Sequence, residues 1–230
     1  MTKEPGTLSV VATPIGNLAD ITLRALDTLR SADVIACEDT RVTAKLLARY
    51  EIEKPLVIFH AQSGRNAATR ILQLLADGKR VALVTDAGTP GISDPGSALV
   101  REVKDRLREE ARIEVIPGPA AVTAALSIAG VPTDEFTFLG FLPHKKGRQT
   151  LFAEIAEAPR TMVFYESPHR IEKALASLRE VLVPERRVVV LRELTKLYES
   201  VEEGSAEEVA AYFAAHPDEV RGEFVVIVAP

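Results

Sequence analysis

Short apolar runs alternate with amphipathic stretches of helical length, and this alternation restricts the possible fold more than any other feature. The first-half runs, such as Val81-Ala82-Leu83-Val84, are almost continuously apolar, which is typical of strands buried on both faces of a parallel sheet. We therefore expect an α/β fold that begins with a mainly parallel sheet covered by helices. The expected strands are Thr7–Ala12, Asp33–Cys37, Leu56–His60, Arg80–Thr85 and Arg112–Ile116, and the expected helices are Thr22–Ser31, Val42–Tyr50, Asn66–Ala76 and Ser97–Glu110.

The second half predicts a mixed sheet. Only a short turn separates the strands expected at Arg186–Glu193 and Tyr198–Glu202, so these two would pair as a hairpin. Pro117-Gly118-Pro119 is the natural boundary between two α/β domains, 1–117 and 118–230, and an alanine-rich helix, Ala120–Ala129, follows it. The other expected strands are Phe136–Leu142, Thr161–Glu166 and Phe224–Val228, and the other expected helices are Arg148–Glu157, Pro168–Val181 and Ala206–Ala215.

The composition fits a cytoplasmic globular protein. Hydrophobic residues make up 47% of the 230 residues, and no apolar run reaches the roughly 20 residues of a membrane span. The N-terminus has no signal-peptide pattern. The single cysteine, Cys37, and the scattered histidines offer neither a disulfide nor a zinc-like cluster, so no metal is expected. The net charge of −5 slightly disfavours RNA as a substrate, so any RNA-binding surface must be confined to one part of the protein.

Three loops that follow first-half strands are rich in glycine, proline and small residues: 13–20, 86–96 and 117–121. Ligands of open α/β sheets bind outside the carboxyl ends of the strands. The loop 86–96 holds three glycines, two prolines and two aspartates, more special backbone positions than a turn needs. Its small residues would admit an adenosyl-sized ligand. The sequence GxGxxG is missing, which disfavours a nicotinamide dehydrogenase.

Each loop also has a plainer interpretation. Asp20 would cap the helix after the first loop, and Ser93 or Asp94 would cap the helix after the second. In the third loop, small residues would either leave free N–H groups for a purine or ribose or serve tight helix packing.

Polar clusters follow several strands. Glu38-Asp39-Thr40-Arg41 would position a substrate hydroxyl or form a helix cap with Thr40. In Tyr165-Glu166-Ser167-Pro168-His169-Arg170, Pro168 is expected to open a helix. His144-Lys145-Lys146-Gly147-Arg148 is the most basic short loop, which would contact phosphates or simply be solvated. Arg192-Glu193-Leu194-Thr195-Lys196 would form a paired charge network in a sheet.

Together these pieces resemble the tetrapyrrole methylase superfamily and, within it, the ribosomal RNA small-subunit methyltransferase I family. They run in family order over nearly the whole chain. Ala120 stands where the family commonly has serine. Many relatives continue beyond the last strand into a basic extension that would follow Pro230, so RNA affinity or substrate choice would differ if the extension helps to hold RNA. The matching pieces are Val11–Leu18 with Asp20–Thr22, Glu38–Arg41, Asp86–Pro90 with Ile92–Gly96, Pro117–Pro119, Gly140–Pro143, Phe164–Arg170, Arg192–Lys196 and Gly222–Glu223.

The resemblance implies two α/β domains with a cleft for S-adenosylmethionine between them, and a homodimer. It implies methyl transfer to the ribose 2′-hydroxyl of a cytidine in 16S ribosomal RNA, within the small ribosomal subunit, and no metal. Carried over residue by residue, the cofactor contacts would be Pro14, Ala87, Gly88, Thr89, Ile92, Ala120, Ala121 and Glu166.

A ribose hydroxyl is a weak nucleophile, so a base should assist it. Asp20, Glu38, Asp39 and Asp94 are the candidates, and we expect the Glu38/Asp39 pair to act, with Arg41 holding a phosphate or orienting a carboxylate. The expected contacts with the RNA are Lys145, Lys146, Arg148, His169 and Arg170.

Two other functions agree with part of the sequence. A C-methyltransferase of a tetrapyrrole, such as uroporphyrinogen or a precorrin, would share the fold and the cofactor loops, but Glu38–Arg41 and Tyr165–Arg170 favour the RNA branch. A non-catalytic RNA-binding or ribosome-assembly module would keep the fold alone, and the intact cofactor loops argue against it.

Overall fold

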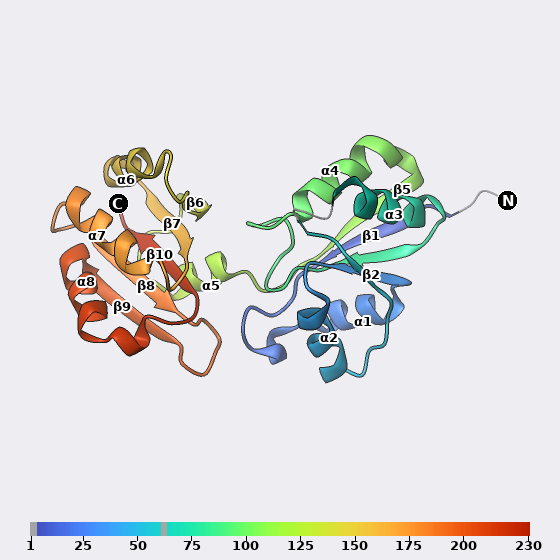
Figure 1. The fold of residues 1–230 in the computed structure, drawn as a ribbon, viewed down its shortest axis with the longest axis horizontal. Helices are drawn as coiled ribbons and strands as arrows, with labels where there is room; N and C mark the ends of the chain where they lie inside the picture. Colours follow the sequence, from blue (N-terminus) through green and yellow to red (C-terminus); the bar gives the residue numbers. More distant parts are fainter. Residues whose placement is uncertain (1–3, 61–63) are drawn as a thin grey trace. The chain divides into compact units, whose positions relative to one another are not determined.

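The computed structural model describes residues 4–60 and 64–230. The chain divides into two compact units, Met1–Ala120 and Ala121–Pro230 (Figure 1). The predicted domain ranges, 1–117 and 118–230, stay a prediction, because compactness does not show that either part folds alone.

The first unit is a sheet of five parallel strands in the order β3-β2-β4-β1-β5. The predicted parallel sheet is therefore confirmed. The strands are β1 (Gly6–Val11), β2 (Val34–Cys37), β3 (Leu56–Ile58), β4 (Arg80–Leu83) and β5 (Ala111–Ile116). The α-helices are α1 (Leu23–Ser31), α2 (Thr40–Arg49), α3 (Gly64–Ala76) and α4 (Gly96–Leu107), and short 3-10 helices span Leu18–Asp20 and Arg108–Glu110.

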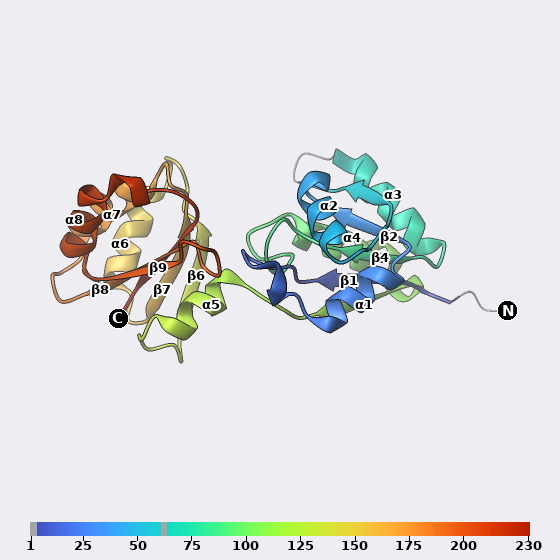
Figure 2. The same cartoon turned by 90° about the horizontal axis from the view of Figure 1, so that it is seen from below.

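Helices cover both faces of this sheet, which explains the continuously apolar strands. Ala82 and Val84 pack in one core with α1 and α2, and Val81 and Leu83 pack in a second core with α3 and α4. Figure 1 shows α3 and α4 on one side of the strands and α1 and α2 on the other, and Figure 2 looks onto the sheet from the side of α1 and α2. Because successive side chains of a strand point to opposite faces, every residue of β4 beyond its first needs to be apolar.

The second unit is a mixed sheet in the order β6-β7-β10-β8-β9. β6 and β7 are parallel, while the other neighbours, including the expected hairpin of β8 and β9, are antiparallel. The strands are β6 (Phe136–Phe141), β7 (Thr161–Glu166), β8 (Arg187–Arg192), β9 (Ser200–Ser205) and β10 (Phe224–Val228). The α-helices are α5 (Ala121–Ile128), α6 (Arg148–Glu157), α7 (Ile171–Val181) and α8 (Ala206–Ala215), and a 3-10 helix spans Pro217–Glu219.

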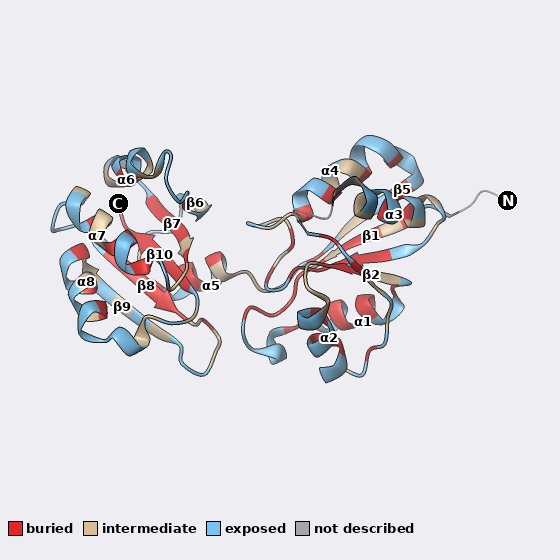
Figure 3. Cartoon of the chain, in the orientation of Figure 1, coloured by how far each residue is buried: buried red, intermediate tan, exposed pale blue. Residues whose placement is uncertain are grey.

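Helices α6, α7 and α8 cover one face of the second sheet and bury a core that includes Phe152, Phe164 and Phe224. In Figure 3 the central strands of this sheet are buried along most of their length. Helix α5 packs against β10 and donates a backbone N–H, from Val122, to the hydroxyl of Tyr165 at 3.0 Å. Tyr165 follows Phe164 in β7, so its side chain points to the opposite face from that core.

Two elements begin two or more residues later than expected. Helix α7 begins at Ile171 rather than Pro168, because the carbonyl of Ser167 accepts from the N–H groups of Arg170 and Ile171, both at 3.0 Å, and closes a separate turn. Strand β9 begins at Ser200 rather than Tyr198. The chain before it turns with left-handed backbone at Glu193 and Thr195, with φ of 51° and 65°.

Candidate active site

The loops that follow β1, β4 and β5 are bonded to one another at the carboxyl edge of the first sheet. The N–H of Thr13 donates to the carbonyl of Gly88 at 2.9 Å, and the N–H of Gly88 donates to the carbonyl of Thr13 at 3.1 Å. The hydroxyl of Thr89 donates to the carbonyl of Pro119 at 3.0 Å. The three loops that the sequence marked for ligand binding therefore form one structure.

Glycine is needed where these loops approach most closely. Gly88 has φ of +84°, and a Cβ there would lie 3.3 Å from Cγ2 of Ile15 and 3.6 Å from the carbonyl oxygen of Pro119. At Gly118 a Cβ would lie only 2.9 Å from the Cβ of Ala12. A side chain at either position would push the loops apart, so small residues here set the shape of the edge.

Asp94 organises its own loop. Its carboxylate accepts from the N–H of Gly91, at 2.8 Å to each oxygen, and from the N–H of Gly96 at 2.7 Å. The N-cap of α4 is Pro95 and not Ser93 or Asp94 as expected, but Asp94 still accepts from the first N–H of the helix, that of Gly96. The corresponding expectation for Asp20 is wrong, because the hydroxyl of Thr22 caps α1 by accepting from Ala25 N at 3.0 Å.

The predicted cofactor residues fall into both units. In the first unit, Pro14 and Gly88 are buried, Thr89 and Ala120 are half-buried, and Ala87 and Ile92 are exposed. All six lie on the three bonded loops. Ala121 is the first residue of α5, and Glu166 ends β7, both in the second unit.

The predicted catalytic residues lie at the carboxyl end of β2. The side chain of Asp39 caps α2 by accepting from Arg41 N at 2.8 Å, so Asp39 rather than Thr40 is the cap. Arg41 also pairs with both carboxylate oxygens of Asp39, its Nη2 at 2.6 Å from Oδ2. The hydrogen bond from Arg41 is the main cause that lowers the pKa of Asp39 to about 2. A carboxylate that holds protons so weakly is a poor base.

The surroundings of Glu38 shift its pKa in the opposite direction, upward. Desolvation by burial raises the pKa of its carboxyl group, the Thr85 hydroxyl opposes this by donating to Oε1 at 2.7 Å, and the nearby charges of Asp94 and Asp86 raise it further. Asp86 also accepts from the N–H of Asp39 at 3.0 Å. The two carboxylates of the predicted catalytic pair therefore differ in role. Asp39 caps α2, and Glu38, with the higher pKa, is the better proton acceptor.

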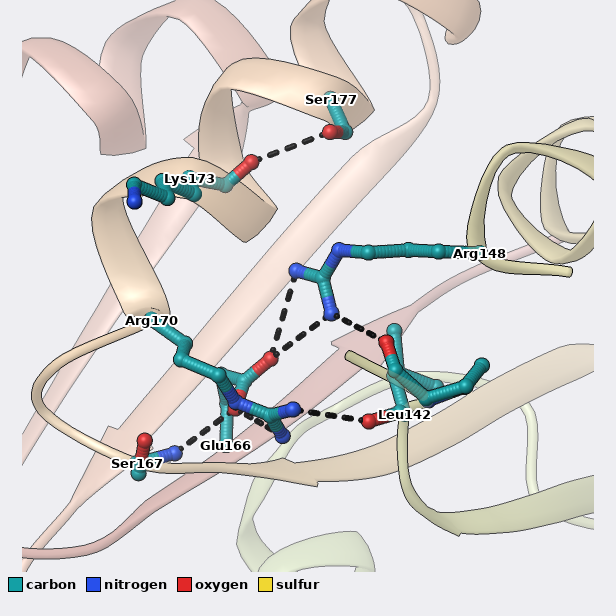
Figure 4. A network of polar contacts seen from close by, with 8 residues as sticks. Leu142, Arg148, Glu166, Ser167, Arg170, Lys173 and Ser177 are labelled. Atoms are coloured by element: carbon teal, nitrogen blue, oxygen red, sulfur yellow. Dashed lines mark hydrogen bonds and ion pairs between the residues drawn. The ribbon is translucent and has the colours of Figure 1, made fainter. Parts of the chain in front are cut away.

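Glu166 lies in a buried charge network in the second unit (Figure 4). Its side chain is fully buried, and those of Arg148 and Arg170 are 14% and 16% exposed. Arg170 approaches Oε1 at 2.6 Å, Arg148 lies 3.4 Å from Oε2, and the N–H of Ser167 donates to Oε1 at 2.9 Å. Both oxygens of the carboxylate that was expected to meet the cofactor are thus engaged within the protein.

The same arginines brace the loop that follows β6. Arg170 donates to the carbonyl of Leu142 at 2.9 Å, and Arg148 donates to the carbonyl of Pro143 at 3.3 Å. Of the residues expected to meet RNA, Arg148 and Arg170 therefore make internal contacts. Lys145, Lys146 and His169 are exposed.

The sequence did not predict the hydrogen bonds made by two hydroxyl groups, those of Thr85 and Tyr165. Thr85 was assigned to the end of a strand, and only the fold brings its hydroxyl to Glu38. Tyr165 was noted as polar, but nothing local indicated that its hydroxyl accepts from the first turn of α5. Within 4–60 and 64–230, no group of three or more His, Cys, Asp or Glu side chains is arranged to hold a metal ion. Over the same residues, the helices are too short or too polar to cross a membrane.

Comparison with known proteins defines the class. The family model of the Tetrapyrrole (Corrin/Porphyrin) Methylases matches residues 7–210. The fold is shared with uroporphyrin-III-C-methyltransferase from Thermus thermophilus (TM-score 0.67, 22% identity, 97% of this chain and 94% of that one). It is also shared with the methyltransferase CobJ (TM-score 0.73, 23% identity, 97% and 94%). The fold is thus that of a tetrapyrrole methylase.

Sequence identity to curated relatives identifies the family within this class. The Ribosomal RNA small subunit methyltransferase I of Neisseria meningitidis serogroup B is 48% identical over 98% of this chain and 76% of its own length. The protein of that name from Thermotoga maritima is 43% identical over 97% of this chain and 98% of its own. The chain belongs to the ribosomal RNA small subunit methyltransferase I family of the tetrapyrrole methylases.

Proposed function

We propose that this chain transfers the methyl group of S-adenosylmethionine to the ribose 2′-hydroxyl of a cytidine in 16S ribosomal RNA. The observation that carries the proposal is identity of 43–48% over nearly the whole chain with proteins named ribosomal RNA small subunit methyltransferase I. A solved uroporphyrin-III C-methyl transferase of the same fold is complexed with S-adenyl homocysteine, which supports the cofactor.

The residues of the three bonded loops fit such a cofactor. Gly88 and Gly118 let the three loops pack closely together, and Ala87 and Ala120 add further small side chains to the same edge. We assign cofactor contacts to Pro14, Ala87, Gly88, Thr89, Ile92, Ala120 and Ala121. When bound, S-adenosylmethionine supplies an electrophilic methyl group, and the protein has to align the nucleophile with it. The cleft between domains that the resemblance implies stays a prediction.

We assign the base to Glu38. Its carboxylate lies at a strand end next to the bonded loops and has a raised pKa, which suits a group that accepts the hydroxyl proton as the methyl group moves from sulfur to the ribose oxygen. Asp39 and Arg41 then act through position, because their mutual ion pair fixes the start of α2.

Exposed lysine and histidine side chains on the second unit suit the RNA backbone. Lys145, Lys146 and His169 extend from loops that Arg148 and Arg170 brace from inside, so we assign the phosphate contacts to these three residues. We propose that Glu166 holds these loops rather than the cofactor, since both of its oxygens are engaged.

We further propose a cytoplasmic location, because the substrate is ribosomal RNA. The homodimer stays a prediction from the family resemblance, and light scattering of the purified protein would test it.

Labelled S-adenosylmethionine tests the proposal when it is offered with undermethylated 30S particles, naked 16S RNA and uroporphyrinogen in parallel. Label on RNA, in the particle or naked, is the expected result. Label on uroporphyrinogen alone would assign the chain to tetrapyrrole methylation. RNA binding without cofactor binding in calorimetry would indicate a non-catalytic ribosome-assembly module.

A further inference from the structure

Strand β6 contains a bulge that turns one aromatic side chain. Phe138 stands opposite Val163 of β7, but Phe141 stands opposite Tyr165, so β6 has one residue more than β7 in this interval. Gly140 absorbs the extra residue with φ of +62°. Without the bulge, Phe141 would align with Glu166 and point into the helix-covered core. With it, Phe141 points to the face of Tyr165.

The turned side chain is held firmly. The ring of Tyr165 contacts Phe138 and Phe141 edge to face, with centroids 4.8 and 5.5 Å apart. Its hydroxyl is fixed in turn by the N–H of Val122 at 3.0 Å. A ring held in this way loses little conformational freedom when a ligand stacks on it.

Phe141 nevertheless remains 56% exposed. The next residues along the chain lead to the exposed side chains of His144, Lys145 and Lys146, of which the two lysines are cations. An exposed aromatic ring beside cations is the combination that binds single-stranded nucleic acid, since the ring stacks on a base while the cations meet phosphates.

We propose that Phe141 is a stacking platform for a nucleobase of the RNA substrate. The inference rests on the proposed function and deepens it, because it names the group that the second unit recognises: an unpaired base next to a phosphate held by the basic loop. Gly140 is the positioning residue, since its left-handed backbone turns the ring outward.

Fluorescence anisotropy with a short labelled single-stranded RNA tests this. The variants are Phe141→Ala, Phe141→Leu and Phe141→Trp. Phe136→Ala is the matched control, because Phe136 is 42% exposed at the other end of the same strand. We expect the alanine and leucine variants to raise the Kd for RNA by about 5- to 150-fold. Phe141→Trp and Phe136→Ala should bind as the wild type does.

Salt dependence separates stacking from charge. Phe141→Ala should leave the slope of log Kd against log salt unchanged, whereas Lys145→Ala should reduce it by about 1. Wild-type RNA affinity in the leucine variant would overturn the inference, since a merely apolar contact would then suffice. Reduced affinity for S-adenosylmethionine in Phe141→Ala would overturn it in favour of stacking on the cofactor.

A changed mass of Phe141→Ala in solution would overturn it in favour of an interface between two copies of the chain. If the wild type methylates RNA while every Phe141 variant does so with unchanged KM, the inference fails and the proposed function stands. If the wild type neither binds nor methylates RNA, both fail.

Discussion

Thr13 and Gly88 exchange two backbone hydrogen bonds, of 2.9 and 3.1 Å, across the carboxyl edge of the first sheet. They join the loops of β1 and β4, which are neighbours in the sheet. The chain leaves β1 for α1, on one face of the sheet, and leaves β4 for α4, on the other face. Ligands of open α/β sheets bind where the connections diverge in this way. The bridge thus lies where the fold itself favours a ligand.

Replacing Gly88 by alanine should weaken cofactor binding. Left-handed backbone at a non-glycine residue costs about 1–2 kcal/mol, and the added Cβ would meet Ile15 and Pro119. Gly130→Ala is the control, because Gly130 has φ of +63° but nothing within 4 Å of a new Cβ. Urea denaturation should show a loss of stability in both variants, and calorimetry should show weakened S-adenosylmethionine binding in Gly88→Ala alone. Equal cofactor affinity in the two variants would refute this role of the bridge.

Glu38→Gln should abolish turnover and leave cofactor affinity unchanged, because the amide cannot accept the hydroxyl proton. Asp39→Asn should keep turnover and lower the melting temperature, since it keeps a capping oxygen but loses the ion pair with Arg41. Single-turnover kinetics with undermethylated RNA measures the first effect. Full activity in Glu38→Gln, or its loss in Asp39→Asn alone, would move the base away from Glu38.

The pH dependence follows from the raised pKa of Glu38. A base works only when deprotonated, so the rate should rise with pH through a pKa above the ordinary 4.5. Thr85→Val removes a hydrogen bond that lowers this pKa, so the acid limb should move to higher pH, while Thr85→Ser should keep it in place. An acid limb that does not respond to Thr85 would argue against Glu38.

The raised pKa of Glu38 should also make the free energy of unfolding depend on pH. The folded state holds the Glu38 proton more tightly than the unfolded chain does, so the stabilisation is present below pH 4.5 and is lost as the pH rises through the folded pKa. Glu38→Gln should remove this part of the dependence in urea titrations at several pH values. An identical pH dependence in the variant would contradict it.

The sequence predicted the first sheet well, because strands covered on both faces must be apolar at most positions, and β4 shows that pattern from Val81 onward. It also marked the three loops, since their glycines and prolines are visible locally. The role of Glu166 could not be predicted from the sequence. A polar residue at a strand end looks the same whether it meets a ligand or, as here, two arginines brought together by folding. The bulge at Gly140 likewise depends on register with β7.

Glu166→Ala should destabilise the protein strongly. It leaves the cations of Arg148 and Arg170 without their buried counter-charge, and removing one partner of a buried pair costs about 3–5 kcal/mol. Glu203→Ala breaks the exposed pair with Arg187 and is the control, with an expected cost of about 0–1 kcal/mol. Equal denaturation midpoints for the two variants would show that the network does not brace the loops.

Replacing both Lys145 and Lys146 by alanine should weaken RNA binding at all sequences and flatten its salt dependence, because each phosphate that is no longer neutralised keeps about one counterion that binding would otherwise release. Methylation should show a raised KM for RNA and an unchanged affinity for S-adenosylmethionine. Lys104→Ala, on α4 of the first unit, is a control for net charge. The same KM in the double variant and the control would exclude the basic loop from RNA binding.

The central claim is the chemistry at a ribose oxygen. Undermethylated 30S particles treated with this protein and S-adenosylmethionine can be digested to nucleosides, and mass spectrometry then identifies the methylated species. The account predicts 2′-O-methylcytidine, absent when the Glu38→Gln variant is used. A methyl group on a nucleobase, or on no nucleoside of the RNA, would contradict it.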